Sequence, residues 1–557
     1  MLFGRRRKRR RERELDPDEI FLDSSNLSDF DTGQLEGRLE KPIERNTFAG
    51  IGVVALIIGT ALVAQAANLQ MIQGERYSAQ SERNRLRPQV LFAERGAIVD
   101  RNGFALVYNE AGDDGFVTRK YESPGFAHLL GYVSYPRRDS SGKFYDTEIT
   151  GLSGVESAMN DVLSGKNGTL LVEEDALGKI QSSGTVKPAE KGQTVTLSID
   201  ARAQRAFARS VKSLADSVPF KGGSAILMDV NTGEVHALVS YPEYDSNVLS
   251  SGGPSEVIAG YQKDTRQVYL DRAVSGLYTP GSIVKPMEIA GALTDGIVTP
   301  ETVIVSNGFI SIPNAYDPSR PTIFKDWKIL GPMNARSAVA WSSDVYFYTI
   351  GGGFNGIRGL GIERLKYWYD LFGFTSKTGI ELEGEAEGFV PTPAWKEERY
   401  GDPWRVGDTY NTAIGQYAMQ VTPLGAARAV AAVANGGKLV RPTLVKDAPL
   451  QGKSIPVDQA ALQVAQEGMR LGATEGTSKG LSDLSFVKVA GKTGTAQLGV
   501  NNEFHSSWAV GYFPYDNPKY AYVVVMERGP AANLVGGIYV TYHALRELYQ
   551  TAPEYFE

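Results

Sequence analysis

The sequence predicts an α+β protein that carries one membrane-spanning helix, a β-rich middle region and a large C-terminal domain. Three observations predict this arrangement. A stretch of twenty residues without charge lies at 48–67. Short apolar runs interrupted by glycine fill residues 68–195. From 196 to 557, strand patterns at both ends enclose a series of helix patterns, which is typical of one antiparallel sheet with helices around it.

Composition excludes several classes of site. The 557 residues are 42% hydrophobic and 22% charged, a chain long enough for two to four domains. The net charge of −6 does not provide the basic face that broad nucleic-acid binding needs, so no nucleic-acid partner is expected. The absence of cysteine excludes disulfides, thiolate zinc sites and cysteine nucleophiles. The four histidines offer few candidates for a catalytic triad or a metal site.

Residues 1–47 form a basic and then acidic tail. Arg5 to Arg13 carries eight basic residues, and an acidic run from Asp16 to Asp31 follows. So few apolar side chains cannot offset the entropy cost of ordering, and we predict disorder. A basic cluster can also bind nucleic acid, but its position before an apolar segment favours a role in membrane topology.

Residues 48–67 predict a transmembrane helix, because twenty residues at a rise of about 1.5 Å span about 30 Å of hydrocarbon. The alternatives are a buried core helix and a cleaved signal peptide with Ala64-Gln65-Ala66 as the cleavage site. The polar flank argues against the first alternative, and the long preceding tail argues against the second. The arginines before the segment place the N-terminus in the cytoplasm and the residues that follow the segment on the outer side of the membrane.

Turn signals predict three hairpins around Asp100-Arg101-Asn102-Gly103, Asn231-Thr232-Gly233 and Asp516-Asn517-Pro518. Asp200 is expected to cap a helix, because apolar residues recur at helical spacing after it. A helix over residues 539–550 is expected near the C-terminus.

Ser-x-x-Lys occurs three times, and two copies lack a suitable local structure. Ser140 and Lys143 lie in a polar loop without a helix signal. Ser485 and Lys488 lie in an alternating run that predicts a strand, where residues three apart point to opposite faces. Neither pair is expected to act together.

Ser282 and Lys285 follow Pro280-Gly281 at the start of an apolar helix pattern. Residues three apart on a helix share a face. The helix N-terminus would direct backbone N–H groups toward the serine, which suits the formation of an oxyanion. The alternative is an ordinary serine cap with a solvent-exposed lysine.

Lys-Thr-Gly occurs twice, and we choose the second copy. Lys377-Thr378-Gly379 is predicted to lie in a loop that leads into a short strand. Lys492-Thr493-Gly494-Thr495 follows an alternating run, and a strand edge can present N–H groups and hydroxyls to a substrate in register. Ser342-Ser343-Asp344 lies between the chosen motifs, at a predicted helix start or loop.

The order of these motifs resembles that of the serine acyl-transferases that react with penicillin. With "ERGAIVDRNG", "GLSGVESAMNDVLSGKNG", "SSDVYFY" and "NTAIGQYAMQVTPLGAARAVAAVANGG", the chain resembles a class B penicillin-binding protein from about residue 45 onward, and the elongation-type transpeptidase of rod-shaped growth most closely. Asp344 favours the elongation type, because division-type relatives usually have asparagine there. Tyr417 departs from the family, which more often has glycine after Ile414-Gly415-Gln416.

The resemblance implies a pedestal domain of the dimerisation type over 68–195 and a transpeptidase domain over 196–557, with a five-stranded antiparallel sheet flanked by helices. It implies a cytoplasmic-membrane enzyme that crosslinks the D-Ala-D-Ala stem peptides of peptidoglycan, is acylated by β-lactams and uses no metal or cofactor. No Glu-Asp-x-x-Phe signature of a glycan polymerase is present. A glycan polymerase of the SEDS family is the expected partner.

The resemblance, together with the chemistry of these groups, also assigns roles. Ser282 is the expected nucleophile and Lys285 its base, which should be uncharged because burial and a second cation, Lys492, lower its pKa. Ser342 would pass a proton to the leaving amine, and Asp344 would orient this network or steer the incoming amine. The backbone N–H groups of Ser282 and Thr495 would form the oxyanion hole. The expected binding site for the donor carboxylate comprises Lys492, Thr493, Gly494 and Thr495.

Other functions fit the same motifs. A D,D-carboxypeptidase or a β-lactamase would use water instead of the acceptor amine. A division-type transpeptidase would use the same acyl-enzyme. A membrane-anchored β-lactam sensor or scaffold would lack turnover.

Overall fold

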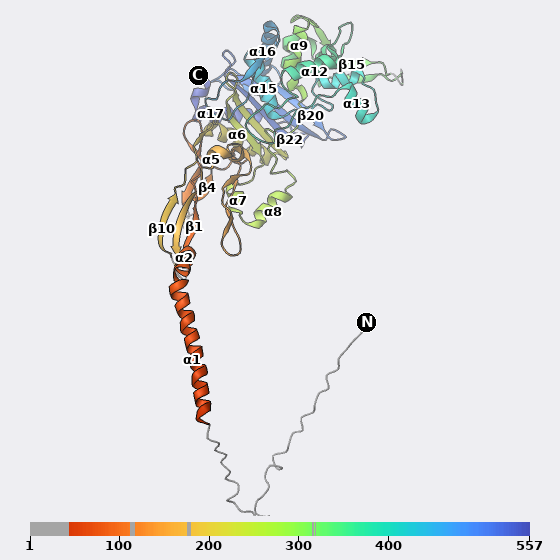
Figure 1. Cartoon of the computed structure of the whole chain (residues 1–557). Helices are drawn as coiled ribbons and strands as arrows, with labels where there is room; N and C mark the ends of the chain where they lie inside the picture. The colour runs from red at the N-terminus through yellow and green to blue at the C-terminus, as the bar shows by residue number, and fades with distance from the viewer. Residues whose placement is uncertain (1–43, 112–116, 175–179, 315–316, 318) are drawn as a thin grey trace, which may run out of the picture. The chain divides into compact units, whose positions relative to one another are not determined.

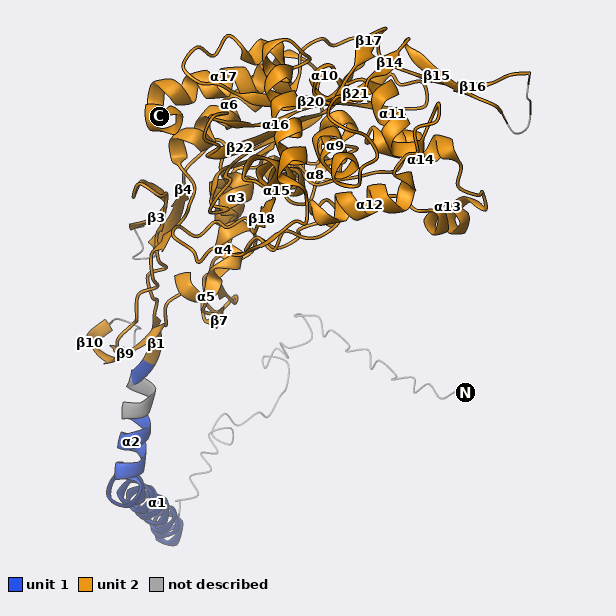
Figure 2. Cartoon of the chain, turned by 90° about the horizontal axis from the view of Figure 1, so that it is seen from above, with its two compact units in different colours: residues 1–87, 174–177 blue, residues 88–173, 178–557 orange. Residues whose placement is uncertain are grey.

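The computed structural model describes residues 44–111, 117–174, 180–314, 317 and 319–557. Most of the predicted disordered tail therefore lies outside the described residues. The chain divides into two compact units, residues 1–87 with 174–177 and residues 88–173 with 178–557 (Figure 2).

The first unit contains one long apolar helix. Helix α1 (Arg45–Ala67) continues through the π-helical turn η4 (Asn68–Ile72), and the polar helix α2 (Gly74–Arg85) follows (Figure 1). Residues 45–72 are long and apolar enough to cross a membrane, and none of their most apolar stretch is buried. An apolar helix whose most apolar stretch is not buried fits a membrane anchor, as the sequence predicts.

The β-rich region up to residue 197 is built from short strands. The predicted hairpin at Asp100–Gly103 is present, because β2 and β3 pair as antiparallel strands on either side of it. Strand β11 pairs with β2, and α6 begins after Asp200, whose carboxylate accepts a hydrogen bond from Arg202 N as expected of a cap. The domain boundary at 195/196 stays a prediction. The sheets have the strand orders β1-β9-β10, β11-β2-β3-β4, β5-β8 and β6-β7. Three short helices lie among the strands: α3 Ala127–Leu130, α4 Gly154–Ala158 and α5 Asn160–Leu163. The strands are β1 Leu86–Leu91, β2 Ile98–Val99, β3 Ala105–Ala111, β4 Val117–Tyr121, β5 Val133–Ser134, β6 Arg137–Arg138, β7 Phe144–Asp146, β8 Thr150–Gly151, β9 Gly168–Glu174, β10 Ile180–Lys187 and β11 Val195–Thr196.

The larger part of the second unit is organised around a five-stranded antiparallel sheet of order β13-β12-β22-β21-β20, which confirms the predicted fold class. Two of its neighbouring pairs, β12–β13 and β21–β22, are the remaining predicted hairpins. Strand β20 lies at the edge of the sheet. The strands are β12 Gly222–Asp229, β13 Val235–Tyr241, β20 Ala490–Leu498, β21 Phe504–Phe513 and β22 Tyr520–Pro530.

Helices cover both faces of this sheet (Figure 1). Successive strand side chains point to opposite faces. Leu227 and Val524 therefore join one core with α6 (Ala201–Ser217) and α17 (Gly537–Thr551), which is the predicted C-terminal helix. Ile226 and Val523 join a second core with α9 (Lys285–Thr294), α15 (Pro423–Ala434) and α16 (Gln459–Thr474).

The remaining elements pack around one of these two cores or at their margins. They include helices α7 Ser246–Ser251, α8 Ser255–Lys263, α10 Ala335–Trp341, α11 Asp344–Gly352, α12 Gly361–Leu371, α13 Pro393–Tyr400 and α14 Val406–Ala413, the 3₁₀ turns η5 Gly281–Val284, η6 Lys479–Leu481 and η7 Pro553–Phe556, and the strand pairs β14–β17 (Ile304–Ser306, Gly331–Met333), β15–β16 (Phe309–Ile312, Thr322–Lys325) and β18–β19 (Lys438–Val440, Gly452–Ser454).

Three local predictions need correction. Strand β20 begins at Ala490, so Ser485 and Lys488 lie in turns before the strand rather than in it. No strand follows Gly379 directly, and that copy of Lys-Thr-Gly lies in an irregular loop. Ser282 occupies the 3₁₀ turn η5, and the α-helix itself begins at Lys285. Contacts with other segments stabilise the irregular backbone in the first two cases: Tyr515 N donates to Lys488 O, and the Glu385 carboxylate accepts from Thr378 N and Gly379 N.

Candidate active site

Ser282 lies in a turn that packs directly against the edge strand β20. A Cβ atom added to Gly281 would stand 2.8 Å from the carbonyl oxygen of Thr495, and one added to Gly494 would stand 2.7 Å from the carbonyl oxygen of Pro280. Gly281 also has a φ of +57°, which glycine adopts readily. These glycines allow the Ser282 turn and the Lys-Thr-Gly strand to meet backbone to backbone.

A loop that follows α14 supports the same turn. Gly281 N donates to Gly415 O at 2.8 Å, and a Cβ on Gly415 would lie 2.2 Å from Gly281 O. Gln416 Nε2 donates to Thr495 O at 3.0 Å. The turn that carries Ser282 is therefore clamped between the 414–416 loop and β20. Residue chemistry alone gave no signal for the clamp except the glycine, although the loop belongs to one of the stretches that carry the family resemblance.

Ser342 and Asp344 lie at the junction of two helices. Ser342 ends α10 in the left-handed conformation, with φ +58°, and α11 begins at Asp344. Such strained backbone in a residue other than glycine persists only where its surroundings enforce it. Asp326 provides part of this enforcement, because its Oδ2 accepts from Ser343 Oγ at 2.8 Å and from Val345 N at 3.1 Å.

A buried chain of hydrogen bonds joins the three motifs. Lys285 Nζ donates to Asp344 Oδ1 at 2.6 Å and to the carbonyl oxygen of Ser342 at 2.8 Å, and it lies 3.3 Å from Ser342 Oγ. Lys492 Nζ lies 2.9 Å from the same Ser342 Oγ. Both lysines are almost fully buried, at 0% and 1% exposure. The Ser342 hydroxyl thus connects two amines that come from separate elements, α9 and β20.

The distribution of charge in this hydrogen-bond network differs from the expected one. Burial, followed by the nearby charge of Lys285, holds the pKa of Lys492 well below its ordinary value. Burial raises the pKa of Asp344, while the charge and hydrogen bond of Lys285 lower it. Lys285 forms an ion pair with Asp344, and the lowered pKa of Lys492 favours its uncharged form, whereas we expected Lys492 to be the charged amine. The physical reason is that one carboxylate can neutralise only one of two buried ammonium groups.

The motifs line one cleft of about 1270 Å³. The two lysines lie buried beneath its lining. A further contact that sequence did not indicate, Thr477 Oγ1 with Thr493 Oγ1 at 2.7 Å, holds a hydroxyl of the strand. The predicted site residues in the cleft lining are Ser282, Ser342, Asp344, Thr493, Gly494 and Thr495, and other lining residues include Trp327, Tyr348, Asn411, Gln416 and Tyr417.

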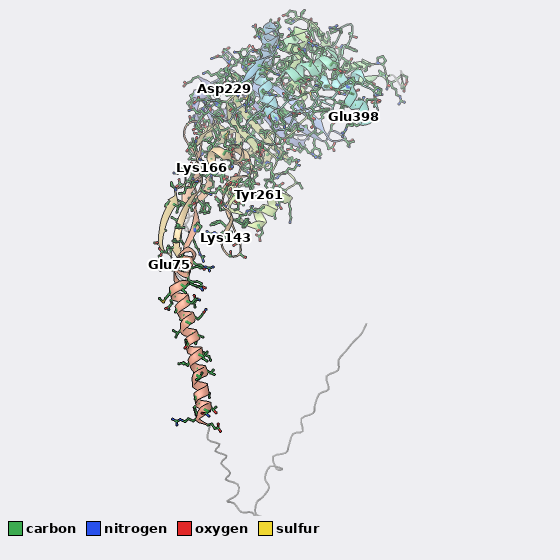
Figure 3. All side chains as sticks on the ribbon, in the orientation of Figure 1. Glu75, Lys143, Lys166, Asp229, Tyr261 and Glu398 are labelled. Atoms are coloured by element: carbon green, nitrogen blue, oxygen red, sulfur yellow. The ribbon has the colours of Figure 1, made fainter. Side chains whose placement is uncertain are left out.

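The rejected motif copies do not line the cleft. Lys143, labelled in Figure 3, precedes β7 in an exposed hairpin with Ser140. Lys488 forms an exposed ion pair with Asp516 at 2.8 Å. Thr378 N donates to a carboxylate oxygen of Glu385 at 2.6 Å, which supports a structural role for that loop. Among the described residues, no group of three histidine or acidic side chains could hold a metal ion.

Comparison with protein families agrees with this site. A family model described as "Penicillin binding protein transpeptidase domain" matches residues 223–543. A second, described as "Penicillin-binding Protein dimerisation domain", matches residues 114–197. The transpeptidase match alone covers more than half of the chain.

Several relatives are named peptidoglycan D,D-transpeptidase MrdA, and one is named peptidoglycan D,D-transpeptidase FtsI. A protein of Haemophilus influenzae named peptidoglycan D,D-transpeptidase MrdA is 33% identical over 72% of this chain and 64% of its own length. The protein of the same name from Acinetobacter baumannii is 29% identical over 88% of this chain and 86% of its own length.

Solved structures agree with these relatives. A Helicobacter pylori structure described as a complex between penicillin-binding protein PBP2 and MreC covers 84% of this chain and 99% of that chain, with a TM-score of 0.69 and 26% identity. One described as "Structural coordination of polymerization and crosslinking by a peptidoglycan synthase complex" covers 89% of this chain and 97% of that chain, with a TM-score of 0.70 and 26% identity. The chain therefore belongs to the penicillin-binding protein transpeptidases, as a class B member most similar to the elongation-type peptidoglycan D,D-transpeptidases.

Proposed function

We propose that this chain crosslinks peptidoglycan stem peptides during cell elongation, through an acyl-enzyme on Ser282. One observation carries the proposal: the Ser342 hydroxyl contacts both Lys285 and Lys492 beneath the cleft that Ser282 lines. A hydroxyl nucleophile, a buried path for protons and an open strand edge meet there, which are the parts that acyl transfer needs.

The donor peptide would lie along β20 as an extended strand, with its terminal carboxylate at Lys492, Thr493 and Thr495. An edge strand supplies N–H and C=O groups for such a peptide. A bound carboxylate would also favour the charged form of Lys492, since an opposite charge nearby raises the pKa of an amine. Lys492 would therefore take up a proton as the substrate binds.

Acylation proceeds by attack of Ser282 Oγ on the carbonyl carbon of the penultimate residue of a D-Ala-D-Ala terminus. The Oγ–C bond forms and the C–N bond to the last D-Ala breaks. The serine proton passes to the Lys285 amine, which is free whenever the proton of the Lys285–Asp344 pair rests on Asp344. A proton passes through Ser342 to the departing nitrogen, so D-Ala leaves as an amine and Ser282 carries an ester.

The backbone N–H groups of Ser282 and Thr495 would stabilise the negative oxygen that develops during this attack. The contact between Gly281 and Thr495 supports this assignment, because it brings the two backbones together. Donors of this kind typically contribute about 3–4 kcal/mol to a transition state. An acceptor amine then attacks the ester: its C–N bond forms, the Oγ–C bond breaks, and the proton that the amine loses passes by way of Lys285 to Ser282 Oγ.

The apolar helix at residues 45–72 supports a single membrane span. We place the N-terminus in the cytoplasm and the catalytic domain outside, in the cytoplasmic membrane, because of the arginines near the start of the chain. The pedestal over 68–195 and the anchor would contact a SEDS-family glycan polymerase. The similarity to a chain of a peptidoglycan synthase complex that coordinates polymerization and crosslinking supports a partner of this kind.

Labelling with penicillin tests the proposal. A penicillin mimics the donor, so the full-length protein should form a stable adduct that mass spectrometry maps to Ser282. Ser282→Ala should abolish the adduct, and Ser140→Ala, which changes one of the two Ser-x-x-Lys copies outside the cleft, should retain it. An adduct that persists in Ser282→Ala would contradict the assignment. An adduct lost to water within seconds would instead indicate a β-lactamase or carboxypeptidase.

A further inference from the structure

Tyr417 has an unusual backbone for a bulky residue. Its φ is +67°, in the left-handed region that favours glycine. The residue belongs to the same loop as Gly415 and Gln416, which clamp the Ser282 turn. Backbone strain of this kind in a residue that lines a cleft is typical of functional sites.

Aromatic neighbours hold the Tyr417 ring in place. The ring packs edge-to-face against Trp395 and Trp404, each with a centroid distance of 6.0 Å. Trp404 is itself fixed, because its Nε1 donates to Thr409 Oγ1 at 2.9 Å. Lys396, which is 5% exposed, forms ion pairs with Asp402 and Asp408, which lie on either side of Trp404 in the sequence. The ring is therefore a rigid part of the cleft lining.

One side of the ring remains open to the cleft. Tyr417 lines the cleft and is 37% exposed. The neighbouring Gln416 bonds the carbonyl oxygen of Thr495 on the open edge of β20. A donor whose carboxylate lies at Lys492 and whose reacting carbonyl lies at Ser282 must continue past Thr495, so its remaining part passes Gln416 and meets the ring.

We propose that Tyr417 is a specificity-determining residue of the acyl-donor site. Its ring forms an apolar wall for the group attached to the amide nitrogen of the residue that acylates Ser282. In a penicillin this group is the acyl side chain, and in a stem peptide it is the preceding residue. The proposal rests on the proposed function, because it takes Ser282 as the acylated residue.

The test compares two penicillins that differ only in this group. Benzylpenicillin carries a phenylacetyl group, and 6-aminopenicillanic acid carries none. The second-order rate constant of acylation of the full-length protein is measured for each by intact-protein mass spectrometry. Tyr417→Gly removes the ring and suits the left-handed backbone, so it should lower the benzylpenicillin to 6-aminopenicillanic acid rate ratio by about three- to tenfold, the effect of one aromatic contact. Tyr417→Phe keeps the ring and should keep the ratio.

Two further variants make the result decisive. Tyr417→Asn, whose side chain also tolerates this backbone, repeats the removal of the ring if the glycine variant fails to fold. Asp447→Gly changes another left-handed residue, with φ +56°, outside the cleft lining and should leave the ratio unchanged. A wild-type ratio in Tyr417→Gly or Tyr417→Asn, with the Ser282 adduct intact, would overturn the inference alone. Failure of the wild-type protein to form an adduct with either compound would overturn the proposed function as well.

Discussion

Replacing Asp344 by asparagine removes one charge from the buried hydrogen-bond chain and preserves its shape. Lys285 Nζ lies 2.6 Å from Asp344 Oδ1, and the lysine side chain is fully buried. Two unit charges at this separation attract by about 6 kcal/mol at an effective dielectric constant of about 20. Desolvation of the carboxylate opposes this attraction. Loss of the carboxylate should therefore cost about 3–5 kcal/mol while the amine stays charged, as for other broken buried pairs.

This cost should appear in the pH dependence of acylation and of stability. Each 1.36 kcal/mol corresponds to about one pH unit, so Asp344→Asn should move the pH of half-maximal acylation down by about 2 units or more. The direction follows because an amine without its counter-ion is more easily deprotonated, and a deprotonated base accepts the Ser282 proton. The free energy of unfolding should fall most at low pH, where the unpaired amine is charged.

Stopped-flow acylation by a fluorescent penicillin between about pH 5 and pH 9, with urea unfolding at the same pH values, measures both effects. Asp516→Asn is the matched control, because Lys488 and Asp516 form the same kind of pair at 2.8 Å but are 61% and 63% exposed. Exposed pairs contribute about 0–1 kcal/mol. If Asp344→Asn left both profiles unchanged, the argument that this pair sets the charge of the site would be refuted.

The remaining predictions concern buried groups of α9 and the Ser282 turn. Glu288 is fully buried, one of its carboxyl oxygens has no hydrogen-bond partner among the described residues, and burial raises its pKa. The folded state therefore keeps a proton that the unfolded chain releases above about pH 4.5, so the free energy of unfolding falls as the pH rises. Glu288→Gln should remove this fall and raise the free energy of unfolding on the order of 1 kcal/mol at pH 8. An equal gain at pH 4 would contradict this reasoning. Gly281→Ala should lower both stability and acylation, because its Cβ would stand 2.8 Å from Thr495 O. Gly296→Ala is the control: Gly296 has φ +66° and no atom within 4 Å of an added Cβ, so this variant should lose only about 1–2 kcal/mol of stability through backbone strain. Calorimetry that finds equal losses of stability for Gly281→Ala and Gly296→Ala would refute the claim that the contact with Thr495 O adds to the cost.

Strong local patterns were sufficient to predict much of the fold. The two apolar runs of β12 and β13 around Asn231-Thr232-Gly233, the cap at Asp200 and the apolar stretch at 48–67 each depend on neighbours a few residues away. Such features form wherever the local sequence occurs. The pattern was less reliable at boundaries. The run before β20 suggested a strand about five residues too early, because partly buried apolar residues of a turn, here Phe486 and Val487, can produce the same alternation.

The candidate site was predictable as a set of groups but not as an arrangement. Three short motifs in order indicated the residues that the structure places in or beneath one cleft. Their supporting residues, Asp326, Gln416 and Thr477, carry no local signal. Their roles arise from contacts between segments that are distant along the chain, as with Gln416 and Thr495, 79 residues apart.

The sequence by itself determined which chemical groups are available: the Ser282 hydroxyl after Pro280-Gly281, two lysines, one aspartate and a strand end that contains glycine. Only the tertiary structure decided which amine pairs with the carboxylate and which is buried with a lowered pKa. Lys285 meets its carboxylate across 59 residues of chain, and Lys492 reaches Ser342 across 150. Protonation depends on burial and on the nearest charges, and both are properties of the folded arrangement.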